Sequence, residues 1–301
     1  MKTILITGSN GLLGQKLVEA LVKKNEMKVV ATSLGENRLL NIEGYVYHEL
    51  DITEKQKVNE LFLKFRPDVI INTAAMTNVD ACETQKELCF KLNVTAVQNM
   101  VDVLTENKLD AHFIHLSTDF VFDGEKGGPY VETDLPNPQS YYAHSKVESE
   151  KLLQKSSIRW AIARTIIVYG IANKMSRSNI VLWAKEALEK GQKINVVDDQ
   201  FRAPTLAEDL ARGCIQIAEK DATGFYHLSG PETMSILELV YSVADLWKLD
   251  RSLITPSKSN NLNQAAKRPP RTGFIIDKAK KELGYAPHSF AEGLALLAKQ
   301  L

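Results

Sequence analysis

The segment that decides the fold is Thr3-Ile4-Leu5-Ile6-Thr7-Gly8-Ser9-Asn10-Gly11-Leu12-Leu13-Gly14, close to the start of the chain. An apolar strand pattern leads directly into three glycines at intervals of three, and the amphipathic segment Gln15–Lys24 follows them. An ordinary strand-to-helix turn explains one such glycine, whereas three at this spacing let the backbone approach a phosphate closely. The segment therefore predicts a strand, a pyrophosphate-binding loop and a helix whose amino terminus faces the phosphates.

Short β-branched runs alternate with longer amphipathic segments through the first half of the chain, a pattern that is typical of βαβ units. The expected strands are Thr3–Thr7, Lys28–Thr32, Val69–Asn72, His112–Leu116 and Trp160–Thr165. We therefore predict an α/β fold with a Rossmann-type, doubly wound parallel sheet and right-handed crossovers.

The pattern changes after Gly170, where a helix over 178–190 and a short strand over 193–197 resemble an insertion. A helix over 205–219 and a strand over 224–228 then return to the sheet. Further expected elements are a helix over 235–247, a mobile surface loop over 256–263 and a short helix over 277–284. Residues 1–170, with 198–230, are expected to form an NADP-binding domain. Residues 171–197 and 231–301 are expected to form a smaller, partly discontinuous substrate lobe, with the binding site in the cleft between the two.

Composition excludes several classes of partner. Lys plus Arg and Asp plus Glu both number 37, so no overall field attracts nucleic acid or an anionic membrane. The three cysteines form no Cys-x-x-Cys pair, which suits a reducing compartment. The apolar run at the amino terminus is too short for a signal peptide, and no stretch has the length of a membrane-spanning helix. We expect a cytoplasmic protein, and a homodimer is left open.

Tyr142 and Lys146 lie four residues apart in Tyr-Tyr-Ala-His-Ser-Lys, which places them on one face of a helix. There an ammonium group can bias the phenol toward proton exchange. Ser117-Thr118-Asp119 ends the strand pattern upstream, where Thr118 can hydrogen-bond a ketone oxygen. Alone, each feature is explained by a solvated helix face or a strand-end turn. Together with the glycine loop they indicate redox chemistry on a carbonyl group.

The end of the second strand bears on the choice of cofactor. It carries Ser33 and no acidic residue of the kind that grips a ribose 2′-hydroxyl about 20 residues beyond the loop. Ser33 and Arg38 can meet a 2′-phosphate, so NADP is favoured over NAD. Glu36 keeps NAD as an alternative, because a shift of the loop brings its carboxylate to the ribose. Asp51 and Ile52 are expected at the adenine edge, although a helix cap also explains Asp51.

These residues resemble the extended short-chain dehydrogenase/reductases, and within them the dTDP-4-dehydrorhamnose reductase family. The resemblance covers nearly the whole chain. Its general marks are the three glycines, Asn93, Tyr142 and Lys146. The motifs more specific to the family are Asn72-Thr73-Ala74-Ala75-Met76-Thr77-Asn78-Val79-Asp80, Ser117-Thr118-Asp119-Phe120-Val121-Phe122-Asp123-Gly124, Asp199-Gln200-Phe201-Arg202-Ala203-Pro204-Thr205 and Arg268-Pro269.

The resemblance implies NADPH-dependent reduction of the 4-keto group of a nucleotide-activated deoxysugar. The catalytic residues are then Thr118, Tyr142 and Lys146, with Tyr142 as the general acid. The expected cofactor-binding residues are Gly8, Asn10, Gly11, Leu12, Leu13, Ser33, Arg38, Asp51, Ile52, Ala74, Ala75, Thr77, Asn93, Tyr142 and Lys146. The expected substrate-binding residues are Thr77, Val79, Asp119, Phe120, Arg202 and Arg268, with the arginines and Arg271 as candidates for the diphosphate.

The chain departs from the family at two points. Some members bind a divalent metal at a dimer contact through a glutamate two residues past the third glycine, where this chain has Lys16. A protonated lysine cannot ligate a metal, so none is expected. After Arg268-Pro269 the usual Asn-Ser is replaced by Pro270-Arg271-Thr272, which leaves the base and the sugar of the substrate open.

Two other functions remain as alternatives. One is a sugar-nucleotide epimerase or dehydratase that regenerates its own cofactor, for which Asp119 beside Thr118 is the relevant acidic residue. The other is a non-catalytic relative that keeps the fold to bind a partner, as in the regulatory subunit of methionine adenosyltransferase. The intact Thr118, Tyr142 and Lys146 argue against this second alternative.

Overall fold

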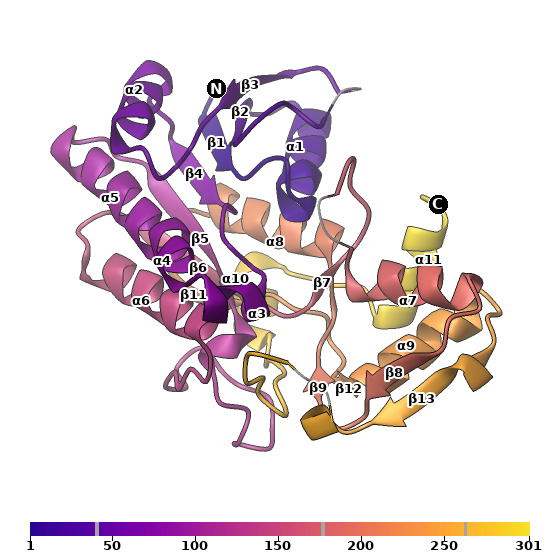
Figure 1. Ribbon diagram of the computed structural model, residues 1–301. Helices are drawn as coiled ribbons and strands as arrows, with labels where there is room; N and C mark the ends of the chain where they lie inside the picture. Colours follow the sequence, from indigo (N-terminus) through magenta and orange to yellow (C-terminus); the bar gives the residue numbers. More distant parts are fainter. Residues whose placement is uncertain (40–41, 176–177, 262–263) are drawn as a thin grey trace.

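The computed structural model describes residues 1–39, 42–175, 178–261 and 264–301. At its centre is a seven-stranded parallel sheet with the strand order β11-β6-β5-β4-β1-β2-β3 (Figure 1). Its strands are β1 (Thr3–Thr7), β2 (Lys28–Ser33), β3 (Tyr45–Glu49), β4 (Val69–Asn72), β5 (His112–Thr118), β6 (Trp160–Thr165) and β11 (Gly224–His227). The predicted α/β fold and its five expected strands are confirmed. Strand order reverses beside β1, which is where a parallel sheet of this kind binds its ligand.

Helices cover both faces of the sheet because its strands are apolar on both sides. In β1, Ile4 and Ile6 pack into one core cluster, whereas Leu5 packs into the other, as the alternation of strand side chains requires. The first face carries α1 (Leu12–Lys24), α8 (Ala207–Glu219) and α10 (Asp277–Leu283). The second carries α2 (Lys55–Phe65), α5 (Ala96–Glu106) and α6 (Tyr141–Lys155).

A smaller lobe with its own apolar core lies beside the sheet (Figure 1). It contains α7 (Ile180–Glu189), α9 (Ile236–Leu246), α11 (Phe290–Ala298) and the parallel pair β8 (Ile194–Val197) and β13 (Ile254–Ser257). Two short pairs join the lobe to the sheet: β7 (Val168–Tyr169) with β10 (Thr205–Leu206), and β9 (Phe201–Arg202) with β12 (Met234–Ser235).

The remaining elements are short. They are α3 (Val79–Thr84), α4 (Lys86–Phe90), a π-helical turn η1 (Lys91–Thr95), and the 3₁₀ turns η2 (Asp119–Val121), η3 (Arg251–Leu253) and η4 (Ser259–Asn261). Within the described ranges, no helix combines the length and the apolar character that crossing a bilayer requires.

Three expectations are corrected. Pro256 and Ser257 belong to β13 and Ser259–Asn261 to a 3₁₀ turn, so the predicted loop is shorter; its last two positions, 262 and 263, lie outside the described residues. Helix α10, expected in the substrate lobe, packs against α8 and β11, because Ala279 and Leu283 bury their side chains there. Residues 201–202, expected within the NADP-binding domain, form a strand, β9, that was not predicted and that pairs with β12.

Candidate active site

The three predicted catalytic residues come from two neighbouring elements at the carboxyl edge of the sheet. Thr118 is the last residue of β5 and caps the η2 turn, where its Oγ1 accepts a hydrogen bond from the Phe120 amide at 3.2 Å. Tyr142 and Lys146 occupy successive turns of α6, as predicted. Ser140 caps this helix by accepting a hydrogen bond from the Ala143 amide at 3.3 Å. The side chains of all three predicted catalytic residues are buried.

The phenol of Tyr142 is held in its protonated form. Burial raises its pKa well above the usual value of 10, and the nearby Asp119 charge adds to the rise. A hydrogen bond with the Thr118 hydroxyl lowers the pKa and so opposes this effect. The ring of Phe120 meets the Tyr142 ring edge-on at a centroid distance of 6.3 Å. A protonated phenol in hydrogen-bonding range of Thr118 is the arrangement that a proton donor to a ketone oxygen requires.

Lys146 is a buried amine whose partner differs from the one expected. Burial lowers its pKa to about 8, while the nearby Glu150 charge raises it. Sequence reasoning placed the ammonium beside the phenol of Tyr142. Among the described residues, Nζ instead makes its hydrogen bond with the imidazole of His115, at 3.0 Å from Nε2. Sequence reasoning gave His115 no role, because no metal-binding spacing or local motif marks it.

The carboxylate of Asp119 is held in place by hydrogen bonds to both of its oxygens. One of its carboxylate oxygens accepts a hydrogen bond from Thr118, and the other accepts one from Thr272. Arg202 lies close by, with Nε 3.5 Å from Oδ2. Burial raises the pKa of Asp119, while Arg202 and the two hydroxyls lower it. Thr272 is a contact that sequence reasoning missed, because only the fold joins it to Asp119.

The structure gives Arg202 a different environment from the predicted diphosphate site. Its guanidinium is buried and donates to the carbonyl oxygens of Pro269, Pro270 and Phe201 at 2.6, 3.4 and 2.7 Å. It also lies over the Phe120 ring at 5.4 Å. Arg202 thus anchors the segment that contains Arg268 and Arg271.

Arg268 keeps a partly exposed position in the same segment. It forms a bidentate ion pair with Asp80 of α3, at 2.6 and 3.1 Å. Arg271 lies over the ring of Phe201 at 4.6 Å, and its side chain is exposed. The basic segment therefore reaches from the smaller lobe toward α3, next to the Tyr142 end of α6.

The glycine loop forms a cradle that excludes larger residues. Gly8 has φ of +69°, and a Cβ there would come within 2.7 Å of the Ala74 backbone nitrogen. A Cβ on Gly14 would lie 2.4 Å from the Gly8 carbonyl oxygen. Gly11 precedes α1 and provides no side-chain cap, and Leu12 and Leu13 form the first turn. The first backbone N–H groups of α1 are therefore free to bind an anion, and the cradle fits a dinucleotide pyrophosphate.

The loop after β2 forms a pocket of about 260 Å³ lined by Leu34, Gly35, Glu36, Asn37, Arg38 and Lys174. Asn10 shapes it: its amide nitrogen donates to the Glu36 carbonyl at 2.8 Å, and its oxygen accepts from the Arg38 amide at 3.0 Å. The Arg38 guanidinium donates to the Lys174 carbonyl at 2.9 Å. Ser33 ends β2 at the start of this loop. Two cationic residues, Arg38 and Lys174, and one carboxylate, that of Glu36, therefore line the pocket. Lys174 was not predicted from the sequence to lie there.

Asn93 lies in the π-helical turn η1 and holds the loop after β4. Its Oδ1 accepts from the Met76 amide at 2.8 Å, and its Nδ2 donates to the Met76 carbonyl at 3.1 Å and to Ser145 Oγ at 2.9 Å. Ala74, Ala75 and Thr77 belong to this loop, and Val79 begins α3 beside Tyr142. A π-helical turn often marks a functional site. Here it orders the loop against α6.

Asp51 and Ile52 follow β3. The Asp51 carboxylate accepts hydrogen bonds from the amide and the hydroxyl of Thr53, at 2.8 and 2.7 Å, and so forms a local turn. The N-cap residue of α2 is Glu54. Ile52 is buried in the core cluster of the α2 face. The helix-cap explanation of Asp51 is therefore wrong by three positions, and its predicted role at the adenine edge stays a prediction.

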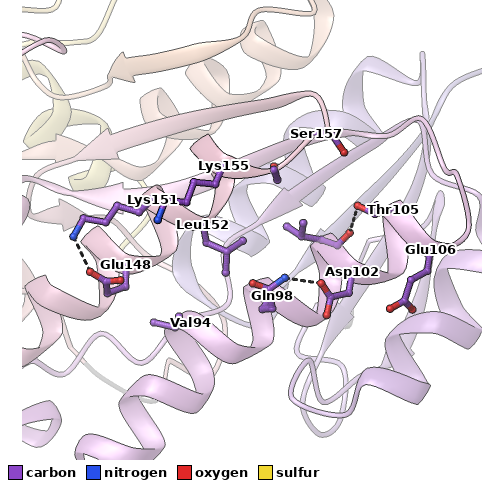
Figure 2. Close-up of a pocket in the computed structure, with 12 residues that line it drawn as sticks. Val94, Gln98, Asp102, Thr105, Glu106, Glu148, Lys151, Leu152, Lys155 and Ser157 are labelled. Atoms are coloured by element: carbon purple, nitrogen blue, oxygen red, sulfur yellow. Dashed lines mark hydrogen bonds and ion pairs between the residues drawn. The ribbon is translucent and has the colours of Figure 1, made fainter.

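A separate groove of about 680 Å³ runs between α5 and α6 (Figure 2). Side chains of both charges line it, including Asp102, Glu148 and Lys151, and none of the predicted site residues is among them. Lys151 is paired with Glu148 at 2.9 Å. The groove is thus distinct from the catalytic edge of the sheet.

The position of Lys16 bears on metal binding. Its Nζ lies 3.1 Å from Glu208 Oε1 and 3.4 Å from Glu19 Oε2, so the ammonium pairs within its own chain. In the part of the chain that the structure describes, no group of three or more His, Cys, Asp or Glu side chains is arranged to hold a metal ion.

Comparison with known proteins gives a family for this site. The family model described as "RmlD substrate binding domain" matches residues 1–301. A dTDP-4-dehydrorhamnose reductase of Aggregatibacter actinomycetemcomitans is 32% identical over 305 residues, covering 98% of this chain and 97% of the relative. The methionine adenosyltransferase 2 subunit beta of Xenopus laevis is 31% identical over 257 residues, covering 84% and 74%.

A solved structure agrees. The dTDP-4-dehydrorhamnose reductase of Bacillus anthracis strain Ames, crystallised in complex with NADP, superposes with a TM-score of 0.85 at 26% identity and covers all of both chains. The fold is the one predicted from the resemblance. The chain therefore belongs to the RmlD family of dTDP-4-dehydrorhamnose reductases, within the extended short-chain dehydrogenase/reductases.

Proposed function

We propose that this protein is an NADPH-dependent reductase of the 4-keto group of a nucleotide-activated deoxysugar, dTDP-4-dehydro-L-rhamnose, which it converts to dTDP-L-rhamnose. The observation that carries the proposal is the meeting of Thr118, Tyr142 and Lys146 at the sheet edge that also holds the glycine cradle. The reductase from Aggregatibacter actinomycetemcomitans, which is similar to this chain over almost its whole length, supports the same reaction.

The chain's own residues account for the proton chemistry. When bound, the nicotinamide supplies the hydride for the ketone carbon. With substrate bound, the Thr118 hydroxyl turns its single proton from Asp119 Oδ1 to the ketone oxygen and stabilises negative charge as it develops there. Tyr142, kept protonated by burial, gives its phenolic proton to that oxygen. The Lys146 ammonium holds the ribose hydroxyls and stabilises the phenolate that remains.

The pocket after β2 is proposed to bind the 2′-phosphate of NADPH, with Arg38 as its main cation. Arg38→Gln should raise the KM for NADPH roughly tenfold, since hydrogen bonds to a charged group contribute about 1.5–3 kcal/mol, and should change the KM for NADH much less. Lys174→Gln should act in the same direction. Steady-state kinetics with both cofactors measures the effect. An equal loss with NADH would remove the 2′-phosphate from this pocket.

The smaller lobe is proposed to hold the nucleotide. Arg268 and Arg271 extend from it near α3, where guanidinium groups suit a diphosphate. The Arg202 guanidinium holds the backbone of this segment by donating hydrogen bonds to carbonyl oxygens of Pro269 and Phe201. We assign Arg202 no direct contact with substrate.

The dehydratase alternative needs a carboxyl group that is free to exchange a proton with the sugar. Asp119 is 2% exposed, and its Oδ2 accepts a hydrogen bond from the Thr272 hydroxyl, a contact that does not depend on Thr118. Redox-neutral turnover without added NADPH would favour that alternative over a reductase.

A non-catalytic role is the second candidate, and the similarity to methionine adenosyltransferase 2 subunit beta favours it. It predicts a partner that co-purifies in fixed ratio and no turnover of any sugar nucleotide. A screen of nucleotide sugars with NADPH and NADH, followed by identification of the product by NMR, separates the two functions. Reduction at C4 of the dTDP sugar supports the reductase; the absence of any reduced product contradicts it.

A further inference from the structure

His115 has the closest contact with the lysine of the active site. It lies on β5, three residues before Thr118, and is 1% exposed. Its Nε2 is 3.0 Å from Lys146 Nζ and 3.1 Å from Ser149 Oγ. Its Nδ1 is 3.0 Å from the amide nitrogen of Asn72, at the end of β4. Both ring nitrogens therefore have partners, and one of these is the catalytic lysine.

The other groups that face Lys146 do not replace this contact. Glu150, one turn further along α6, directs its carboxylate to Arg164 of β6, at 2.9 and 2.8 Å, and to Ser117 Oγ at 2.6 Å. Cys89 of α4 has its hydrogen bonds with Ser145 and Asn93, and it can raise the pKa of Lys146 only as a thiolate. Tyr142 lies one turn earlier on α6 and makes no hydrogen bond to Nζ in the described structure. The imidazole is thus the group positioned to accept a hydrogen bond from the Lys146 ammonium.

The chemistry of the ring suits an acceptor. Burial and the Lys146 charge lower the pKa of His115 well below 6.5, so the imidazole is neutral and keeps one nitrogen lone pair. Ser149 Oγ gives its own proton to the Lys146 carbonyl at 2.8 Å and does not compete as a donor for that lone pair. With Nε2 as the acceptor, Nδ1 carries the ring proton, so the Asn72 side chain must turn its amide by 180° from the orientation in which Nδ2 faces Nδ1, and present its oxygen there. The Thr7 hydroxyl, which can both donate and accept, then accepts from Asn72 Nδ2.

The ring is also fixed in place by the strands beside it. The Asn72 amide contacts the Thr7 hydroxyl at 2.5 Å, and Thr7 is the last residue of β1 before the glycine loop. A line of contacts therefore runs from β1 through Asn72 and His115 to Lys146. Strands of one sheet are rigid supports for a catalytic group.

We propose that His115 is a positioning residue that accepts a hydrogen bond from the Lys146 ammonium through Nε2, and so keeps this buried group charged and directed at the cofactor and Tyr142. The proposal rests on the proposed function, since that is where Lys146 receives its role. A hydrogen bond that favours the charged form of a buried amine opposes the loss of its proton.

The test compares the pH dependence of kcat/KM for NADPH-dependent reduction in the wild type and in two variants. Wild type should lose activity as pH rises through about 8, where Lys146 loses its proton. His115→Phe removes the hydrogen-bond acceptor and so should lower the pKa of Lys146. The basic limb of the profile, which is the loss of activity at high pH, should then move to a pH about one unit lower, because hydrogen bonds to charged groups are among the stronger ones. His115→Gln places an amide oxygen near the position of Nε2 and should restore the limb.

His112 offers a matched control. It is a second buried histidine on β5, and its odd spacing from His115 puts it on the opposite face of the sheet, beside Asp221 at 3.5 Å. His112→Phe should leave the basic limb at its wild-type pH. Three results would overturn the proposal. Folded His115→Phe could lose activity at the same pH as the wild type, or His115→Gln could lose it at a pH as low as His115→Phe does. The third is a shift in His112→Phe as large as that in His115→Phe.

A second measurement does not depend on turnover. Nitrogen-15 NMR of the six histidines should show Nε2 of His115 without a proton at pH 7. Its resonance should move in Lys146→Met. A protonated Nε2 in the wild type, or no change in Lys146→Met, would contradict the role of His115 even if the reaction were confirmed. The expected NMR result in a protein that reduces no sugar nucleotide would support the contact and refute only the proposed function. The NMR test on wild type also applies if His115→Phe does not fold.

Discussion

At the scale of single residues, the site depends on a lysine whose burial conflicts with its charge. Lys146 is 2% exposed, and burial lowers its pKa from 10.5 to about 8. A folded-state pKa below the unfolded-state value means that the charged form destabilises the folded protein. This conflict is typical of functional sites, where stability is reduced to position a reactive group.

Lys146→Met should therefore stabilise the protein without cofactor while it abolishes reduction. The gain should be on the order of 3 kcal/mol at pH 7, where lysine is charged in both states and the full destabilisation acts. It should diminish between pH 8 and 10.5, as the folded wild type loses the proton that the unfolded chain still holds. Calorimetric Tm values at pH 7 and pH 10 measure this. A variant that is less stable than wild type at pH 7 would contradict the account.

At the scale of elements, the turn between β1 and α1 is required for both the fold and the cofactor. Gly8 combines a positive φ with close contact to the Ala74 backbone, so it meets two separate restrictions. Any side chain there strains the turn and fills the space beside the phosphate site.

Gly8→Ala should thus lower both stability and NADPH affinity. Gly191 is a suitable control, because it has φ of +67°, a Cβ added there would have nothing within 4 Å, and it lies at the end of α7 away from the site. Gly191→Ala should cost only the left-handed strain of about 1–2 kcal/mol. Gly8→Ala should cost clearly more in urea unfolding, and its NADPH binding by fluorescence should be lost. Equal costs in the two variants would show that the contact with Ala74 is unimportant.

Elements with strong local signals could be predicted, and those with weak signals could not. The five predicted strands of the main sheet contain apolar runs, and the glycine loop fixes the position of α1. Strand β3, Tyr45–Glu49, carries mixed side chains, is exposed in part and lies at the sheet edge, so its sequence resembles a loop. Strand β13 contains a proline, which disfavours a strand, but it is the edge partner of β8 alone.

At the scale of the whole molecule, buried polar contacts join the smaller lobe to the catalytic edge. Arg202 of β9 and Thr272 both reach Asp119, the residue next to Thr118. The segment 269–272 is therefore coupled to Thr118 through the buried charges of Arg202 and Asp119. Breaking one member of such a buried pair leaves the other charge uncompensated.

Arg202→Met should destabilise the protein by about 3–5 kcal/mol and weaken substrate binding. Asp119→Asn in the same chain should recover part of the stability, because it removes the unpaired carboxylate. The difference from wild type should shrink at low pH, since protonation of Asp119 also removes that charge. Urea unfolding of the single and double variants measures both effects. A double variant no more stable than Arg202→Met would contradict the coupling.

The parts of the site that sequence could not reveal are those made by long-range contacts. Thr118, Tyr142 and Lys146 can be identified because helical spacing and a strand end mark them locally. Lys174 meets Arg38 across 136 residues, and Thr272 meets Asp119 across 153. His115 escapes prediction for another reason: it lies within an apolar strand pattern, where a buried histidine gives no local signal of its contact with Lys146.

The most direct test of the central claim is the oxidation of NADPH, followed at the nicotinamide absorbance band, when purified protein is mixed with dTDP-4-dehydro-L-rhamnose. Tyr142→Phe keeps the ring packed against Phe120 and removes the phenolic hydroxyl, the proposed proton donor. We predict rapid NADPH oxidation by the wild type and none above background by Tyr142→Phe. Oxidation that persists in Tyr142→Phe, or none with the wild type, would contradict the account.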